Sequence, residues 1–203
     1  MNHHQQSLKK DFANFQKYHP QHPTVNSFNL KEEELFLIKS YAGSWSSWVN
    51  SDPRSGIVLK DKCKIIFASL LENSLRKMPS FNSNTVFRMD KPHTDNNSDV
   101  LFWFENKIGC SFTLPIFLST SKEEWDDDFY PITWEIKTIS KNSFGKDISL
   151  LLRKFEEEVL FNRGAKFKII DVDFKKSKIN LSELENGKKT DFELLGRYWE
   201  NIE

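Results

Sequence analysis

The chain has 203 residues, and a polypeptide of this length buries roughly 70% of the surface that its unfolded form exposes, enough for one large domain. Its 29 Lys and Arg residues balance 29 Asp and Glu residues, so no single-sign field is left to hold a nucleic-acid backbone or an anionic membrane. The 18 Phe, 6 Trp and 4 Tyr residues supply large core side chains and argue against wholesale disorder.

The first 28 residues are polar and contain Pro20 and Pro23, which predicts a loosely attached arm with a short helix over residues 11–18. Residues 29–203 are then expected to form a single domain. No apolar stretch follows a basic start, so a standard secretory signal is not expected. We therefore expect a cytoplasmic protein, or one delivered into the cytosol of a host or target cell by a route that needs no such signal.

The first helix of the domain has a clear predicted start. Asn29 followed by Glu32 has the spacing of a capping box, with acidic residues in the first turn. This predicts a helix over residues 30–41 that ends near Gly43.

Two further helices are expected before the strands begin. A short one should pass through Trp45 and Trp48, and a longer one should run from about Asp61 to Met78. The apolar residues of the longer helix recur at helical spacing, namely Ile65, Ile66, Leu70, Leu71 and Leu75.

From residue 85 onward, short β-branched and aromatic runs alternate with loops, which predicts strands. Helices followed by strands are typical of the α+β class, so we expect a strand-rich core with helices to one side. The predicted strands cover residues 85–89, 100–104, 111–113, 117–120, 133–138, 159–161, 166–174, 178–181 and 191–198.

Cysteine and histidine are too sparse to support several kinds of site. Cys63 and Cys110 are the two cysteines, and neither belongs to a CxxC pair, which disfavours a thiolate zinc site and a disulfide framework. A histidine-dependent triad would rest on His93, in a loop-like polar run. There is no glycine-rich phosphate loop either. If the chain is an enzyme, carboxylates, hydroxyls and an arginine must do the chemistry.

An arginine interrupts the apolar strand predicted at residues 86–90. Period-two geometry places Arg88 on one face and Phe87 and Met89 on the other. A guanidinium in such a place is suited to a bidentate grip on a pyrophosphate or a carboxylate. The alternative is an ordinary ion pair at a strand end.

Three consecutive hydroxyl residues, Ser119, Thr120 and Ser121, end the apolar run 112–118. Hydroxyls both donate and accept hydrogen bonds, so they can orient a polar neighbour without carrying charge. The alternative is a strand that ends in residues favoured by strands and turns.

Three glutamates follow Phe155 in the run 155–161. If this run is extended, Glu156 and Glu158 point to one side, and two carboxylates on one face can divide the work of stabilising a cation and orienting a nucleophile. Periodicity alone favours the other interpretation, an amphipathic helix over residues 150–160 whose acids face water.

In this order, Arg, then Ser-Thr-Ser, then Glu-x-Glu, the runs resemble the arginine-serine-glutamate class of mono-ADP-ribosyltransferases, which includes the catalytic domains of bacterial toxins. Residues 30–44 resemble the first helix of that class with its Tyr-x-Gly-Ser ending. Residues 112–121 resemble its hydroxyl strand, and residues 158–169 its final glutamate strand and turn. The resemblance covers about residues 30–175.

The resemblance implies an α+β fold in which N-terminal helices accompany a mixed core of two packed β-sheets, with an NAD cleft between them. It also implies a loop before the first glutamate and a strand after it, in place of a helix over residues 150–160. NAD is the implied co-substrate and no metal is required. The implied activity is transfer of ADP-ribose to an arginine of an unidentified intracellular target protein, as a toxin or effector.

The resemblance assigns a role to each run. Glu158 is the indispensable carboxylate, Arg88 grips the NAD phosphates, and Ser119 holds Glu158 in register. Thr120 and Ser121 shape the nicotinamide-ribose pocket, and Phe87 and Met89 flank it, although members of the class often carry Gly where Met89 stands. Glu156 polarises the nucleophile, and Phe155 contacts the acceptor.

Three alternatives stay open at this point. The alternatives to a transferase that modifies a protein arginine are an NAD glycohydrolase, a transferase with a non-protein acceptor, and a non-catalytic NAD-binding module. The neutral charge disfavours a nucleic-acid acceptor. The acidic run 122–130 is expected to form a solvated helix or a surface that selects a basic target.

Overall fold

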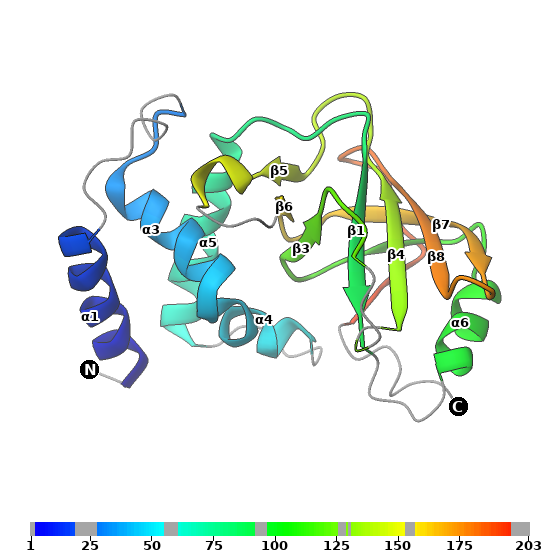
Figure 1. Cartoon of the computed structure of the whole chain (residues 1–203), viewed down its shortest axis with the longest axis horizontal. Helices are drawn as coiled ribbons and strands as arrows, with labels where there is room; N and C mark the ends of the chain where they lie inside the picture. Colours follow the sequence, from blue (N-terminus) through cyan, green and yellow to red (C-terminus); the bar gives the residue numbers. More distant parts are fainter. Residues whose placement is uncertain are drawn as a thin grey trace.

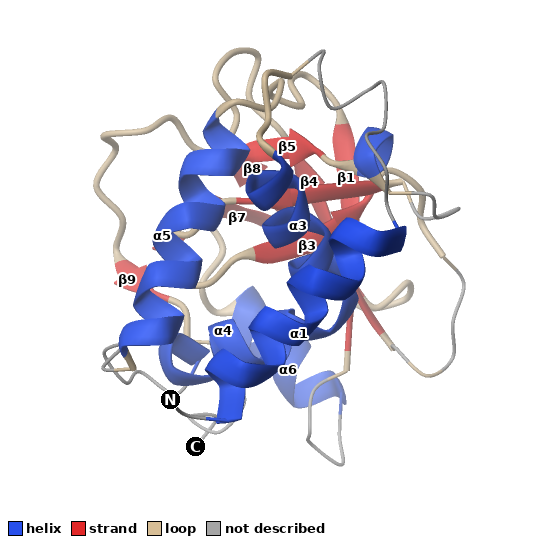
Figure 2. Ribbon diagram, turned by 90° about the vertical axis from the view of Figure 1, so that its left-hand side faces the viewer, coloured by secondary structure: helices blue, strands red, loops and turns tan. Residues whose placement is uncertain are grey.

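The computed structural model describes residues 3–18, 28–54, 61–91, 97–125, 129, 131–152 and 157–195. Within these residues, the helical segments that precede the first strand are α1 (His3–Tyr18), α3 (Glu32–Ser40), the π-helical turn η1 (Tyr41–Trp45), α4 (Ser46–Arg54) and α5 (Lys62–Arg76). They gather at one end of the molecule, and the strands occupy the other (Figure 1). Seen from that end, these helices lie in front of the sheet (Figure 2). Among the described residues, no helix is long and apolar enough to cross a membrane.

The start of α3 differs from the prediction by two residues. Asn29 has a left-handed backbone with φ of 52° and lies outside the helix. Lys31 is the N-cap residue, and its backbone N–H donates to Glu34 Oε2 at 2.8 Å. Glu34 therefore fills the capping position predicted for Glu32, because the chain turns at Asn29 before the helix begins.

Gly43 was predicted to end this helix, and that prediction is wrong. The residue lies inside η1, which leads directly into α4 without an intervening loop. Gly43 does not have a positive φ. A glycine that ends a helix usually adopts the left-handed conformation, in which φ is positive. The short helix expected through Trp45 and Trp48 is present as η1 and α4.

Helix α5 begins as predicted but buries a different face. The Asp61 side chain caps it by accepting from the Cys63 N–H at 2.8 Å. Of the predicted apolar stripe, Leu71 and Leu75 are fully buried, whereas three others are exposed: Ile65, Ile66 and Leu70. Phe67 and Ala68 are buried instead, one helical turn before Leu71. The apolar stripe is wider than the surface that α3 and α4 cover, and Trp48 of α4 packs on Phe67 at 5.9 Å between ring centroids.

Helix α1 is longer than the helix predicted at residues 11–18, and it packs on α3. Phe12 and Phe15 meet Phe36 edge to face, with ring centroids 5.1 and 5.5 Å apart. Phe15 is buried in the same cluster as the residues of α3. The aromatic contacts attach α1 to the helical core.

One predicted strand is a helix. Residues 100–104 lie in α6 (Asn97–Glu105), where Val100, Leu101 and Phe104 are buried. Burial at i, i+1 and i+4 is the pattern of a helix face, but the run is too short for its period to separate a helix from a buried strand.

The other predicted strands are present, and β5 was not predicted. The bounds are β1 (Thr85–Asp90), β2 (Ser111–Thr113), β3 (Leu118–Ser121), β4 (Ile132–Lys137), β5 (Gly145–Asp147), β6 (Glu158–Phe161), β7 (Lys166–Asp173), β8 (Lys178–Glu183) and β9 (Phe192–Glu193). The last predicted strand, 191–198, is represented by β9, and residues 196–198 lie outside the described part of the chain. The α+β class is confirmed.

Within the described residues, hydrogen bonding joins all the strands in the order β5-β6-β3-β1-β4-β8-β7-β2-β9. The two sheets expected from the resemblance are therefore continuous. The link between β3 and β1 is the pair Phe87 and Ser121, which connects β5-β6-β3 to the rest. The sheet curls, so that Phe161 of β6 packs on Phe167 of β7 at 5.4 Å although these strands are not neighbours.

Strands β3 and β6 separate two hydrophobic cores. Leu118, Val159 and Phe161 belong to a core inside the curled sheet. Phe117 and Leu160 belong to the helical core, together with residues of α3 and α5. Because successive side chains of a strand point to opposite faces, β6 contributes to both cores.

A buried polar network attaches the helices to the start of β3. Asn50 Nδ2 donates to the Phe117 carbonyl at 3.0 Å, and the Phe117 N–H donates to Asn50 Oδ1 at 3.1 Å. Tyr41 Oη also donates to that carbonyl, at 3.1 Å. The backbone N–H and C=O of Phe117 are thus both hydrogen-bonded to side chains from η1 and α4. These bonds fix the position at which β3 begins.

A buried carboxylate fixes the loop between β4 and β5. Glu183, the last residue of β8, is 2% exposed. Its two oxygens accept from the Ile139 N–H at 3.1 Å and from the Phe144 N–H at 2.7 Å. Burial raises the pKa of the Glu183 carboxyl, and these hydrogen bonds oppose that rise. The loop leads directly into β5, which pairs with β6.

Replacing Asn50 by Ala should destabilise the fold, because it leaves the buried N–H of Phe117 without its acceptor and removes one donor to its carbonyl. We expect a loss of about 2 to 3 kcal/mol in the free energy of unfolding, measured by urea denaturation. Asn73→Ala, at an exposed position of α5, is the control and should change this value by less than about 0.5 kcal/mol. Equal effects of the two substitutions would contradict the anchoring role.

The Glu183 carboxyl should make stability depend on pH. Its folded pKa is raised above the unfolded value of about 4.3, so the native state binds the proton more tightly. This contribution is present below that value and is lost as pH rises through the folded pKa. The unfolding free energy of the wild type should therefore fall relative to that of Glu183→Gln as pH rises. Denaturant unfolding at a series of pH values measures the difference, and the opposite slope would refute it.

Candidate active site

The centre of the candidate site is a hydrogen bond between two adjacent strands. Ser119 Oγ of β3 donates to Glu158 Oε1 of β6 at 2.7 Å. The strands are antiparallel, with Ser121 directly opposite Glu158, so the Ser119, Ser121 and Glu158 side chains lie on one face. Glu158 is 6% exposed. A carboxylate is thus held at the edge of the core, with one oxygen oriented by a hydroxyl.

Arg88 lies beside this pair. It belongs to β1, and its Nη1 donates to the Ser119 carbonyl at 3.2 Å. A guanidinium has five N–H donors, and this bond uses one of them. Alternation places Phe87 and Met89 on the opposite face of β1, and both are half-buried. The structure therefore brings Arg88, Ser119 and Glu158 together at the junction of β1, β3 and β6.

The other two hydroxyls of the Ser-Thr-Ser run lie differently. Thr120 Oγ1 donates to the Val159 carbonyl at 2.7 Å and points to the opposite face from Ser119. Ser121 Oγ shares the face of Ser119 and accepts from the Glu123 N–H at 3.2 Å. Thr120 thus joins the two strands, and Ser121 shapes the turn that follows β3.

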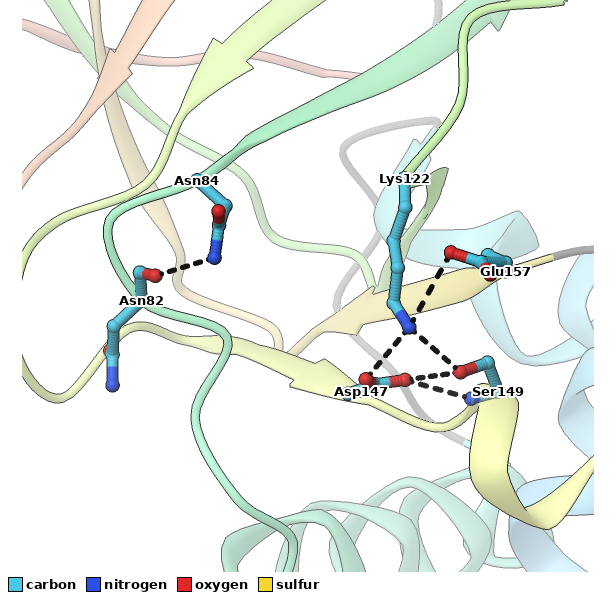
Figure 3. A network of polar contacts seen from close by, with 6 residues as sticks. All are labelled: Asn82, Asn84, Lys122, Asp147, Ser149 and Glu157. Carbon is cyan, nitrogen blue, oxygen red and sulfur yellow. Dashed lines mark hydrogen bonds and ion pairs between the residues drawn. The ribbon is translucent and has the colours of Figure 1, made fainter.

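An ion-pair network surrounds the start of β6 (Figure 3). Lys122 Nζ lies 2.9 Å from Asp147 Oδ2 and 3.7 Å from Glu157 Oε2. It also donates to Ser149 Oγ at 3.0 Å. The network connects the end of β3 with the end of β5 and with the residue before Glu158.

The glutamate strand was correctly predicted from the resemblance, and the helix suggested by periodicity is wrong. Residues 149–151 form a 3-10 turn, and β6 begins at Glu158. Two residues assigned to the acceptor side, Phe155 and Glu156, lie outside the described residues, as does His93.

The acidic run 122–130 is not helical where the structure describes it. Residues 122 and 123 form a bend, residues 124 and 125 have no regular secondary structure, and residues 126–128 and 130 lie outside the described part of the chain. Glu124 pairs with Lys178 at 2.6 Å, and Lys122 belongs to the network at β6. The ion pairs of Lys122 and Glu124 attach this part of the run to the sheet.

Several residues that support the site were not found from the sequence. Asn50 and Lys122 belong to no recognisable local motif, because their partners Phe117 and Asp147 are distant in the chain. Tyr41 belongs to the Tyr-x-Gly-Ser ending, which was the one available signal.

The chemical capacity of the site comes from these groups. A buried carboxylate beside a hydroxyl stabilises a developing cation, and a guanidinium nearby binds an anionic group. Among the described residues, no group of three or more His, Cys, Asp or Glu side chains is arranged to hold a metal ion.

Comparison with protein-family models and with curated proteins gave no match. Solved structures are similar in fold. Plx2a, an ADP-ribosyltransferase toxin from Paenibacillus larvae, is 18% identical with a TM-score of 0.65, over 89% of this chain and 94% of that one. The C3 exoenzyme of Clostridium limosum is 18% identical with a TM-score of 0.63, over 88% and 95%.

A third similar structure is the ADP-ribosyltransferase Vis from Vibrio splendidus, in complex with agmatine. It is 17% identical with a TM-score of 0.59, over 96% of this chain and 94% of that one. The helices, the curled sheet and the strand order described above therefore give this chain the fold of the bacterial ADP-ribosyltransferase toxins.

Proposed function

We propose that the chain is a mono-ADP-ribosyltransferase that transfers ADP-ribose from NAD to an arginine of a target protein. The observation that carries the proposal is the bond from Ser119 Oγ to Glu158 Oε1, beside Arg88, on the fold of ADP-ribosyltransferase toxins. These three residue types occupy three adjacent strands at one junction.

The chemistry of NAD suits such a site. The nicotinamide ring is positively charged, so it leaves as a neutral molecule when the glycosidic C–N bond breaks and its electron pair stays on nicotinamide. No general acid is needed. The ribose then resembles an oxocarbenium ion, as in glycoside hydrolysis, and requires a nearby negative charge. Glu158 supplies that charge and binds a ribose hydroxyl.

The neighbouring residues place the rest of the dinucleotide. We place NAD between β5-β6-β3 and the remainder of the sheet, with its phosphates on Arg88. Ser119 orients Glu158, and Ser121 faces the same side as both. Phe87 and Met89 flank the bound nucleotide. Thr120 acts through the β3–β6 pairing, since its hydroxyl is bonded to the Val159 carbonyl.

The acceptor side is assigned to Glu156 and Phe155. In an extended strand Glu156 shares the face of Glu158. The guanidinium of an acceptor arginine is a poor nucleophile while protonated, and a carboxylate there takes its proton as the new C–N bond to ribose forms. Phe155 contacts the acceptor. The similar Vis structure was solved with agmatine, a guanidino compound, which supports a guanidinium as the acceptor group.

Two of the similar structures, Plx2a and Vis, are toxins, which supports a toxin or effector acting on an intracellular protein. NAD glycohydrolysis is the reaction in which water replaces the acceptor at the same site. It is therefore the reaction against which transfer must be measured.

Glu158→Gln should abolish most NAD cleavage, because an amide keeps the shape of the side chain and loses the charge opposite the oxocarbenium-like ribose. We expect the rate of labelled ADP-ribose transfer to fall by about 10² to 10³ or more. The assay uses labelled NAD with agmatine and with a cell lysate as acceptors.

Glu34→Gln is the control for this change, since Glu34 lies on α3 in an ion pair with Lys77 and outside the site. It should keep nearly the wild-type rate. Transfer that persists undiminished in Glu158→Gln would refute the proposed function.

Glu156→Gln should separate transfer from hydrolysis. Glu158 remains to support cleavage of the glycosidic bond, while the acceptor loses the group that takes its proton. Transfer to agmatine should fall by about 10² or more, and release of free ADP-ribose should fall much less. Chromatographic separation of the two products measures both. A parallel loss of both reactions would contradict this division of roles.

A further inference from the structure

Helix α5 carries an apolar patch that the fold does not bury. One face of the helix packs in the helical core with Phe117 and Leu160, which lie at β3 and β6. The patch lies on the other face and consists of Ile65, Ile66 and Leu70, which are 40%, 58% and 48% exposed. Single exposed aliphatic side chains are ordinary, but neighbouring ones mark a contact surface. The strands lie behind α5 (Figure 2), so the patch faces away from the candidate site.

Exposed cations lie at both ends of the apolar patch. Residues three or four apart are neighbours on one face of a helix. Lys62 lies one turn before Ile66. Asn73 lies one turn after Leu70, and Arg76 follows by a further turn. Arg76 Nη1 donates to Asn73 Oδ1 at 3.4 Å, which keeps the guanidinium along the same face. Lys62 and Arg76 are both exposed.

Acidic side chains are missing from this face. No exposed residue of α5 is acidic. The one acid of the helix, Glu72, is half-buried and pairs with Arg163 at 2.7 Å. Among the described residues, no carboxylate pairs with Lys62 or Arg76. The face is therefore apolar in the middle and positive at both ends, and its occupant must offer apolar groups together with negative charge.

Two kinds of occupant have this chemistry, an anionic membrane and an acidic amphipathic segment of a protein. A stable protein interface buries roughly 800 Å² on each partner, far more than three partly exposed aliphatic side chains on one convex helix can supply. A membrane needs no matching shape. It binds through a few inserted apolar side chains and through Lys and Arg among the headgroups. The size and shape of the face thus favour the membrane.

The neutral charge of the whole chain, which argued against such binding, does not describe this surface. Residues 1–80, which include the helical layer, contain eleven Lys and Arg against seven Asp and Glu, so the acidic excess lies in the remainder of the chain. At physiological ionic strength, charges separated by more than about 8 Å are largely screened. A surface at α5 therefore responds to the cations near it.

We propose that the exposed face of α5 binds an anionic phospholipid membrane. The apolar patch enters the boundary between headgroups and acyl chains, and Lys62 and Arg76 contact the headgroups. The membrane lies on the far side of α5 from β3 and β6, so Ser119 and Glu158 stay accessible. Attachment restricts the chain to a surface and raises the local concentration of acceptors there. This proposal does not depend on the proposed function.

The test is sedimentation of the full chain with large vesicles. One set is phosphatidylcholine, and the other contains about one third phosphatidylserine, which supplies the negative surface. The wild type should bind the anionic vesicles at least about tenfold more tightly than the neutral ones. Added salt should weaken this binding, because it screens the cations.

Two double variants separate the apolar and the charged contributions. Ile66→Ser with Leu70→Ser should weaken binding to the anionic vesicles by about tenfold or more, because inserted aliphatic groups are lost. Lys62→Glu with Arg76→Glu should weaken it by about tenfold or more and remove its dependence on salt. All four positions are exposed, so NAD cleavage measured without vesicles should stay at the wild-type rate.

Matched controls come from the opposite end of the molecule. Ile170→Ser changes an aliphatic residue of β7 that is 49% exposed. Lys175→Glu with Lys176→Glu changes the net charge by the same amount as the α5 pair, at exposed positions after β7. Both controls should bind the anionic vesicles as the wild type does.

The outcomes are distinguishable. A chain that binds the anionic vesicles and consumes no NAD would overturn the proposed function alone. A wild type that binds no vesicle, or α5 variants that bind as the wild type does, would overturn membrane binding and leave an acidic protein segment as the occupant. Equal losses in the controls would also overturn it, because the total charge or apolar content of the chain would then decide the binding.

Discussion

The antiparallel pairing of β3 with β6 is the constraint on which the site depends. With Ser121 opposite Glu158, the register brings Ser119 Oγ to the Glu158 carboxylate. A shift by one residue would turn Glu158 into the core inside the curled sheet, where burial would penalise its charge. Thr120 strengthens the register because its hydroxyl bonds across to the Val159 carbonyl. The hydroxyl run thus holds the strands with one residue and orients the carboxylate with another.

The helices contribute to the site through hydrogen bonds to the backbone of Phe117. Asn50 hydrogen-bonds both the N–H and the C=O of Phe117, and Tyr41 adds a second donor to that carbonyl. The Phe117 ring packs against Tyr41 at 5.4 Å in the helical core. Since Ser119 comes two residues later, the packing of helices far from the carboxylate determines where its hydroxyl lies. The helical layer therefore supports the candidate site as well as covering the sheet.

Local patterns in the sequence were sufficient for features that depend on neighbouring residues. The Asp61 cap, most strands and the order of Arg88, Ser119 and Glu158 belong to this kind, because turn chemistry and alternation act over a few residues. Periodicity failed at residues 100–104 and at residues 150–160, where short runs fit both a strand and a helix. Resemblance to a family resolved the second case and not the first.

Features that depend on distant partners could not be predicted. Ile65, Ile66 and Leu70 are as apolar as Leu71 and Leu75, and it is the positions of α3 and α4 that leave the first three facing solvent. The contact of Lys122 with Asp147 joins two strands that are separated by β4 in the chain. Nothing in the residues beside Lys122 specifies that partner, because the pairing is a product of the curled sheet.

Electrostatics explains why Lys122, which follows β3 in the chain, lies beside the start of β6. Three consecutive glutamates place like charges on one short segment, and two carboxylates that share a site disfavour ionisation of both. Extended geometry separates them by turning Glu157 to the opposite side from Glu158. Lys122 Nζ lies 3.7 Å from Glu157 Oε2 and offsets its charge, so the Glu158 carboxylate faces Ser119 without the charge of Glu157 beside it. Strand alternation and one cation together keep the charge of Glu157 away from the Glu158 carboxylate.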